Sequence, residues 1–302
     1  MAEPHPVIWI DNVSKSYGHV QALSSLNLSV HPGEIFGFLG PNGAGKTTAI
    51  RVLMGFLKPT QGIARVFDAD PWLKPKEIKA RIGFLPDASA LYDGMTGNDF
   101  LNYLAGLHSR PSARREELCD RLELSRSDLQ RKVKGYSHGM RRKLGIVQSM
   151  QHDPDLLIMD EPTQGLDPLT QQAFFVILRE AQARGCTIFF SSHVLSEVEE
   201  LCQRVGIIRQ GTLVAVEQVR ELRRRKVRTM EVEFKGQLPP DLQVEGVEIL
   251  ARGDRWWRLA IKGDINPVLR VLASHDLEDL VFESPHLEDI FLDYYRDESV
   301  AL

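Results

Sequence analysis

The pattern of apolar and polar residues changes character several times along the chain. From residue 7 to about 85, short apolar or alternating runs predict strands, as in Leu26-Asn27-Leu28-Ser29-Val30. From 88 to about 152 the spacing becomes helical, and from 153 to about 215 strands and helices alternate. Helices are expected over residues 100–108, where Thr96-Gly97-Asn98-Asp99 forms the cap, and over 112–124 and 140–151. A further helix is expected from a capping box at Ser196-Glu197-Val198-Glu199 to residue 203. This pattern predicts an α/β domain that contains a helical insert.

A different pattern begins near residue 220. A basic run is followed by predicted strands at 230–234 and 256–261 and by a helix at 267–274. A last helix is expected after Ser284-Pro285, with apolar residues on one face: Leu287, Ile290, Phe291 and Tyr294. The paired Trp256 and Trp257 are expected to pack a small core rather than to bind a ligand.

The basic run at 220–228 has two readings. It has the charge to contact anionic lipid or nucleic acid, but nearby glutamates and the acidic balance of the chain favour a solvated helix end and linker. We therefore expect two domains, an α/β domain over 7–219 with its helical insert at about 88–152, and a small α+β domain over 220–302.

Composition narrows the possible classes of protein. The chain has 302 residues, a net charge of −4 and a pI near 6.2, so there is no general electrostatic case for nucleic acid binding. Cys119, Cys186 and Cys202 are odd in number and lack metal-ligand spacing, which indicates buried thiols in a reducing compartment. No signal-peptide pattern and no stretch of roughly 20 apolar residues is present. Any membrane function is therefore expected to come from a partner chain.

One stretch fits the phosphate-binding pattern G-x-x-x-x-G-K-[ST]: Gly40-Pro41-Asn42-Gly43-Ala44-Gly45-Lys46-Thr47-Thr48. A short apolar strand precedes it, and an amphipathic helix follows it. In that setting, backbone N–H groups and a helix N-terminus surround phosphate oxygens. Lys46 is expected to reach the β- and γ-phosphates and Thr47 to hold Mg²⁺. A glycine-rich turn that binds nothing is the alternative, and the nine-residue match in this context disfavours it.

A second candidate element lies far downstream, where the apolar run at 156–159 ends in Asp160-Glu161. Such a run suits a strand of a parallel sheet that is buried on both faces, and ligands bind at the carboxyl ends of such strands. Asp160 is therefore expected to help hold Mg²⁺, and Glu161 to polarise an attacking water. An ordinary strand can also end in Asp-Glu, so this motif alone is weak evidence for a nucleotide site. Together with the phosphate-binding pattern at 40–48 it is strong evidence.

The segment Tyr136-Ser137-His138-Gly139-Met140, just ahead of this strand, resembles the signature motif of the ABC ATPases. The resemblance implies that Ser137 and Gly139 contact the γ-phosphate of an ATP bound by an opposite subunit. His138 and Met140 depart from the usual Leu-Ser-Gly-Gly-Gln, in a variant similar to that of exporter-type ATPases with separate membrane subunits. The alternative is an N-cap serine and a tight turn before a helix, and the two readings can hold together because a helix N-terminus favours an anion.

Other residues match family motifs in order along the chain. Asp167, in Gly165-Leu166-Asp167-Pro168, resembles the D-loop residue, and His193 resembles the switch histidine that touches the γ-phosphate. Tyr17 resembles the aromatic residue on which adenine stacks, although a tyrosine in a strand-rich segment commonly has a packing role. Asp87 stands where the family has a glutamine that contacts Mg²⁺ and the water. A carboxylate is a suitable ligand for a hard cation, but it is shorter and adds negative charge.

The resemblance implies a P-loop NTPase core of ABC type, with a β-rich N-terminal subdomain, a helical insert and a small accessory domain. We expect an ATPase subunit with ATP and Mg²⁺ as ligands, which powers a transporter, with export favoured. The expected partners are a membrane permease and a second copy of the chain, paired head-to-tail, at the cytoplasmic face of the cell membrane. A soluble ABC ATPase that acts on ribosomes or nucleic acid is the alternative, but no second cassette or coiled-coil insert is present. A small GTPase is disfavoured because the guanine motif Asn-Lys-x-Asp is missing.

Overall fold

The structure is a computed structural model that describes residues 5–87, 91–225, 228–236, 242 and 244–283. The chain divides into two compact units, Met1–Gln218 and Val219–Leu302. Among the residues described, no helix is both long enough and apolar enough to cross a membrane.

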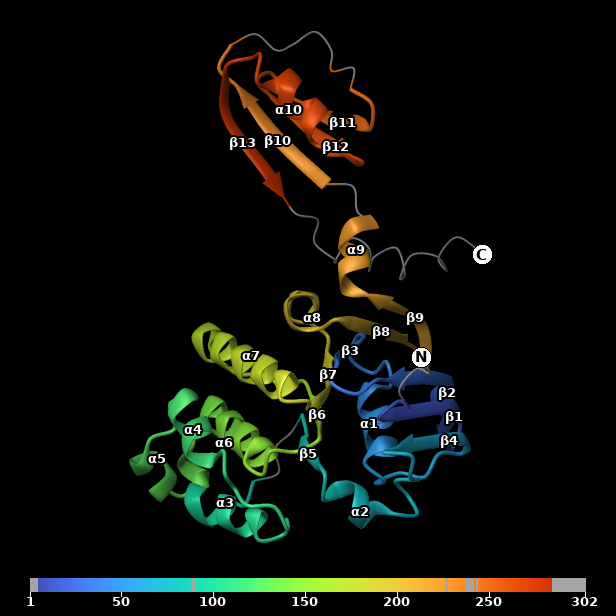
Figure 1. Cartoon of the computed structure of the whole chain (residues 1–302), viewed down its shortest axis with the longest axis vertical. Helices are drawn as coiled ribbons and strands as arrows, with labels where there is room; N and C mark the ends of the chain where they lie inside the picture. The colour runs from blue at the N-terminus through green and yellow to red at the C-terminus, as the bar shows by residue number, and fades with distance from the viewer. Residues whose placement is uncertain (1–4, 88–90, 226–227, 237–241, 243, 284–302) are drawn as a thin grey trace. The chain divides into compact units, whose positions relative to one another are not determined.

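The centre of the first unit is a six-stranded sheet in the order β5-β6-β7-β3-β8-β9 (Figure 1). Its strands are β5 (Ile82–Leu85), β6 (Leu156–Asp160), β7 (Thr187–Ser192), β3 (Ile35–Leu39), β8 (Arg204–Arg209) and β9 (Thr212–Gln218). The first five run parallel, and only β9 is antiparallel to its neighbour. All residues of β3, β6 and β7 are buried, as expected for parallel strands covered on both faces.

A smaller antiparallel sheet has the order β2-β1-β4 and consists of β1 (Ile8–Tyr17), β2 (Val20–Val30) and β4 (Gln61–Val66). The helix α1 (Lys46–Leu53) shares one hydrophobic core with both sheets. Its apolar face, including Ile50 and Leu53, packs with Leu26 of β2 and Phe38 of β3 in that core. The small sheet therefore packs against the helix that follows the phosphate-binding loop and helps to fix its position.

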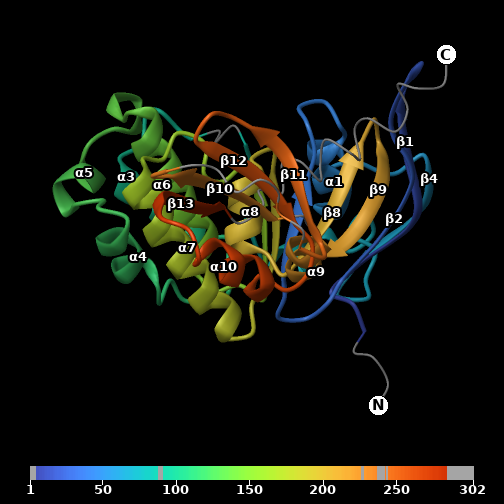
Figure 2. The same cartoon turned by 90° about the horizontal axis from the view of Figure 1, so that it is seen from above.

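The helical insert lies between β5 and β6, on the opposite side of the first unit from the small sheet (Figures 1 and 2). Its helices are α3 (Gly97–Ala105), α4 (Arg115–Arg121), α5 (Arg126–Gln130) and α6 (His138–Met150), after a short α2 (Pro75–Lys79) that precedes β5. The helix predicted over 112–124 is too long at both ends, because α4 covers only Arg115–Arg121. Glu123 has a left-handed φ of 56°, which stops α4, and a capping box between Ser125 and Asp128 starts α5.

The capping box predicted at residue 196 is also wrong. Helix α8 (Leu195–Leu201) begins after Val194, which has no side-chain cap. The Glu197 side chain turns inward and accepts a hydrogen bond of 2.7 Å from the Ser192 hydroxyl. Helix α7 (Pro168–Ala183) comes earlier in the chain, between β6 and β7.

The second unit begins with α9 (Val219–Arg225) and contains the antiparallel sheet β11-β12-β10-β13. Its elements are β10 (Arg228–Phe234), β11 (Val247–Arg252), β12 (Trp256–Ile261), α10 (Asn266–Leu272) and β13 (Leu277–Glu283). Trp257 is buried among Phe234 and Leu259, whereas Trp256 is 43% exposed, so only one of the paired tryptophans packs the core. The predicted final helix lies outside the described residues.

Candidate nucleotide-binding site

The carboxyl ends of β3, β6 and β7 meet at one edge of the large sheet because these strands are parallel neighbours. The loop at 40–45 joins β3 to α1 at this edge. A Cβ atom on Gly40 would lie 2.4 Å from the Ile208 carbonyl oxygen. Gly45 has a φ of 108°, and a Cβ there would lie 2.6 Å from the Ala22 carbonyl oxygen. Glycine is therefore required at both positions, by close approach and by backbone conformation.

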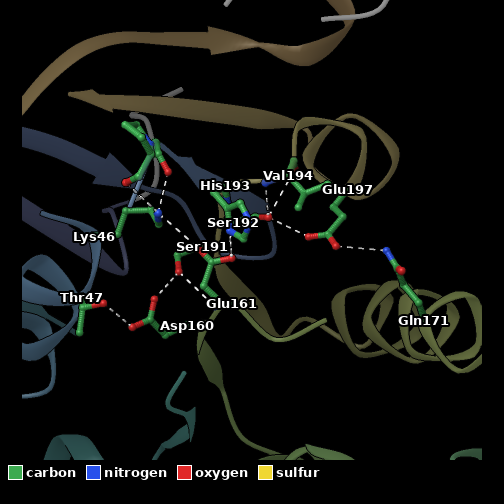
Figure 3. Close-up of polar contacts among 12 residues, drawn as sticks. Lys46, Thr47, Asp160, Glu161, Gln171, Ser191, Ser192, His193, Val194 and Glu197 are labelled. Atoms are coloured by element: carbon green, nitrogen blue, oxygen red, sulfur yellow. Dashed lines mark hydrogen bonds and ion pairs between the residues drawn. The ribbon is translucent and has the colours of Figure 1, made fainter. Parts of the chain in front are cut away.

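Lys46 reaches back over this loop from the first position of α1. Its Nζ donates to the carbonyl oxygen of Gly40 at 2.6 Å and to that of Pro41 at 3.2 Å. The same Nζ lies 3.2 Å from Oε1 of Glu161, and Figure 3 shows the two side chains directed toward one another. The ammonium group is buried, so water screens its attraction for a negatively charged group at the loop less than it would at the surface.

Asp160 links the other two strand ends to the loop. Its carboxylate accepts hydrogen bonds from Thr47 Oγ1 at 2.8 Å and from Ser191 Oγ at 2.6 Å (Figure 3). Burial raises the pKa of the Asp160 carboxyl, and these two hydrogen bonds oppose the rise. The Thr47 hydroxyl and the Asp160 carboxylate thus offer adjacent hard oxygen ligands, a set that fits Mg²⁺.

Glu161 follows in a left-handed conformation, with a φ of 48° that is uncommon for a residue with a side chain. Its N–H donates to the Ser191 carbonyl oxygen at 3.2 Å. Its Oε2 lies 2.8 Å from Nδ1 of His193, while Oε1 faces Lys46 (Figure 3). The carboxylate is therefore held between the loop lysine and the histidine, in position to act on a group bound at the loop.

An open cavity lies over these residues. It is lined by Ala22, Pro41, Asn42, Gly43, Gly45, Lys46, Thr47, Thr48, Asp87, Asp160 and Glu161. Asp87 therefore joins the loop and the two acidic residues from a different segment, the one that follows β5. Gly40 and Ala44 belong to the loop without lining the cavity.

His193 also lies outside this lining, although its imidazole contacts Glu161. Four further predicted site residues, Ser137, Gly139, Asp167 and Tyr17, are absent from the lining as well. Ser137 is the N-cap of α6 and accepts a hydrogen bond from the Met140 N–H at 3.2 Å. Asp167 is the N-cap of α7 and accepts from the Thr170 N–H at 2.9 Å, and its hydrogen bonds with Thr170 lower the pKa of its carboxyl. Gly139 lies against the Gly165 backbone. Tyr17, at the end of β1, has a ring that is 45% exposed.

Three residues of the site were missed by the sequence reasoning. Ser191 donates to Asp160, buried Glu197 accepts from Ser192, and buried Arg142 contacts the backbone of Asp160 and Glu161. Burial raises the pKa of the Glu197 carboxyl. A signal for Arg142 existed, because it lies one turn ahead of the buried Ile146 on α6. Among the described residues, no cluster of His, Cys, Asp and Glu forms a separate metal site.

Comparison with known proteins agrees with this geometry. Residues 23–164 match the family described as ABC transporter. The chain is 37% identical over 235 residues to the bacitracin transport ATP-binding protein of Bacillus licheniformis, covering 76% of each chain. It is 34% identical over 297 residues to the Nod factor export ATP-binding protein I of Paraburkholderia xenovorans, covering 96% of this chain and 97% of that one.

A solved ATP-binding subunit of an ABC transporter has a similar fold, with a TM-score of 0.68 and 27% identity over 72% of this chain and 92% of that chain. The α/β fold with its helical insert, predicted from the sequence, is thereby confirmed. The loop, the two acidic residues at the end of β6 and the relatives together lead to one conclusion. The chain belongs to the ABC transporter family and is an ATP-binding, ATP-hydrolysing subunit of a transporter.

Proposed function

We propose that this ATPase subunit powers export through a membrane permease, with two copies of the chain paired head-to-tail around two ATP molecules. The observation that supports the catalytic part of the proposal is the carboxylate of Glu161, held between Lys46 and His193 beside the phosphate-binding loop. This arrangement places a base, a cation and a switchable imidazole around the position where a terminal phosphate would lie.

In the proposed reaction, the backbone N–H groups of the loop and Lys46 bind the phosphates. Glu161 orients the attacking water and accepts its proton, and His193 holds the glutamate through its imidazole. Mg²⁺, when bound beside Thr47 and Asp160, would neutralise charge on the phosphate oxygens. Asp87 lines the same cavity, and we propose that it approaches this ion or its water.

Pairing of two copies is supported by the predicted site residues that do not line the cavity. Ser137 and Gly139 are at the start of α6 and do not line the cavity of their own chain, and Ser137 is exposed. A helix N-terminus with a free face is suited to a phosphate presented by another chain. Asp167, at the start of α7, and the exposed Tyr17 ring are proposed to contact the partner and adenine respectively.

The direction of transport is proposed from the relatives. The similar protein of Paraburkholderia xenovorans is named for Nod factor export and matches this chain over nearly its full length. Since transport requires a path through the bilayer, we propose a separate permease as partner and a peripheral location on the cytoplasmic face of the membrane. The cargo would then be recognised by that permease. The alternative of a soluble factor that acts on ribosomes or nucleic acid has no specific support in the site.

The test is Glu161→Gln, which removes the base while preserving the size of the side chain. We expect kcat for ATP hydrolysis to fall about 10²–10⁴-fold, while ATP binding persists because the loop is intact. The variant should also accumulate an ATP-bound dimer in size-exclusion chromatography, since hydrolysis no longer separates the two copies. Glu200→Gln is the matched control, because the Glu200 carboxylate lies at the surface in an ion pair with Arg179, away from the cavity. Near-normal hydrolysis by Glu161→Gln would refute the role given to this carboxylate.

A further inference from the structure

Arg142 is a buried side chain next to the site that uses all of its hydrogen-bond donors. A guanidinium group has five N–H donors, and here every contact is to a backbone carbonyl oxygen. Nε donates to Pro162 at 2.9 Å, Nη1 to Pro86 at 2.7 Å and to Asp87 at 2.8 Å. Nη2 donates to Asp160 at 2.8 Å and also to Glu161. Five contacts match five donors, so the guanidinium holds five backbone carbonyl groups at once, an arrangement that we call the Arg142 clamp.

These carbonyls come from two segments that the chain separates widely. Pro86 and Asp87 follow β5, whereas Asp160, Glu161 and Pro162 follow β6. Arg142 itself belongs to a third element, α6, which packs on α3, α4 and β5. One side chain thus ties the helical insert to both acidic segments of the site.

The guanidinium of Arg142 is a buried positive charge. Arg142 is 3% exposed, and no ion pair to a carboxylate is recorded for it among the described residues. Burial lowers the pKa of its guanidinium to about 10, and the negative charges of Asp87, Asp160 and Glu161 oppose that shift. The group therefore remains charged at neutral pH, with its charge balanced by the carboxylates of the site rather than by a partner of its own.

The clamp also bears on the strained backbone of Glu161. A left-handed conformation at a residue with a side chain persists only where its surroundings hold it. The N–H of Glu161 is held by Ser191 of β7, and its carbonyl oxygen is held by Arg142. The position of the Glu161 carboxylate therefore depends on where α6 places Arg142.

We propose that Arg142 is a positioning residue that couples the helical insert to catalysis. Movement of α6, which carries Ser137 at its N-terminus, is transmitted through the Arg142 guanidinium to the backbone of Glu161 and Asp87. ATP affinity depends on the loop at 40–48 and is independent of this clamp. The inference rests on the catalytic role proposed above for Glu161.

The test compares Arg142→Lys and Arg142→Ala with the wild-type protein. Lysine keeps the charge but has three donors on a single nitrogen, so it cannot span both segments. We expect kcat to fall about 10–10²-fold in Arg142→Lys, with the KM for ATP and the affinity for a fluorescent ATP analogue within about twofold of wild type. Arg179→Gln is the control, because Arg179 lies at the surface and contacts the carboxylate and the backbone carbonyl oxygen of Glu200, away from the cavity.

Chemical rescue separates positioning from simple loss of stability. In Arg142→Ala, added guanidinium ion, far below denaturing concentrations, is expected to restore part of kcat by occupying the vacated site, with no such gain in Arg179→Gln. If Arg142→Ala does not fold, Arg142→Lys alone decides the question. A kcat in Arg142→Lys equal to that of Arg179→Gln would overturn the proposal, and so would a loss confined to ATP affinity. Glu161→Gln, measured in parallel, distinguishes failure of this inference from failure of the catalytic assignment.

Discussion

At the scale of single residues, the site is governed by crowded negative charge. The carboxylates of Asp87, Asp160 and Glu161 lie near the phosphate-binding loop, and Lys46 and Arg142 are the buried cations that face them. Asp160 and Glu161 have hydrogen-bonding or ion-pair partners of their own. The Asp87 side chain is exposed and makes no hydrogen bond within the described part of the chain, whereas its backbone carbonyl oxygen accepts from Arg142. Asp87 is therefore the member of the set whose charge can be removed with the least disturbance.

We predict that Asp87→Gln holds or raises the rate of ATP hydrolysis and changes its dependence on Mg²⁺ concentration. The substitution removes a negative charge beside the phosphates and lengthens the side chain, while the loop that binds ATP is untouched. Asp87→Asn is the matched variant, because it removes the charge without adding length. The measurement is ATPase rate against Mg²⁺ concentration for all three proteins. Identical curves would show that the Asp87 side chain is a bystander.

At the scale of elements, α6 carries two of the residues proposed to act at the site, Ser137 and Arg142. Its N-cap, Ser137, presents the motif proposed to meet a partner's phosphate, and Arg142 follows little more than one turn later on the buried face. The helix begins where it does because the Ser137 hydroxyl accepts the Met140 N–H. The hydroxyl oxygen accepts this N–H while its own hydrogen can still be donated to a phosphate, so the cap and the proposed contact can coexist. The two roles can be separated by substitution.

We predict that Ser137→Ala lowers the free energy of unfolding by about 1 kcal/mol, because an N-cap is lost. Ser137→Asn should recover that stability, since asparagine is an effective N-cap, but it should not recover ATP hydrolysis if the hydroxyl itself contacts the phosphate. Urea denaturation followed by circular dichroism gives the first quantity and a steady-state ATPase assay the second. Activity that simply tracks stability across the two variants would leave Ser137 with a capping role alone.

At the scale of the whole molecule, the chain is built from two units with separate hydrophobic cores. The core of the first unit is shared by both of its sheets and α1, and that of the second is centred on Trp257 and Phe234. The described residues that line the candidate site all belong to the first unit. Nucleotide binding is therefore expected to be a property of the first unit.

We predict that a fragment of residues 1–218 folds and binds ATP with an affinity within about threefold of the full chain, because its core and the loop at 40–48 are complete. The fragment ends with the last residue of β9, so no strand of the large sheet is cut. Thermal unfolding and titration with a fluorescent ATP analogue test this. A fragment that aggregates, or that loses ATP affinity tenfold, would contradict the independence of the first unit.

The sequence by itself determined the features that depend on contiguous residues. The phosphate-binding loop and its flanking strand and helix are a local pattern, as is the N-cap of α3, where Thr96 accepts the Asp99 N–H at 3.1 Å. The buried strand that ends in Asp160-Glu161 was recognisable because a run of four apolar residues suits a parallel sheet. The ABC ATPase fold followed from such motifs in their order along the chain.

Only the tertiary structure decided which polar side chains turn inward. Arg141, Arg142 and Lys143 are consecutive cations, yet Arg142 alone is buried, because two distant strand ends bring five carbonyl oxygens to its position. Glu197 was read only as an intervening residue of the capping box at 196–199, but Ser192 on another element offers it a buried partner. A buried charge is stable only where remote groups satisfy it, and that condition cannot be read from neighbouring residues.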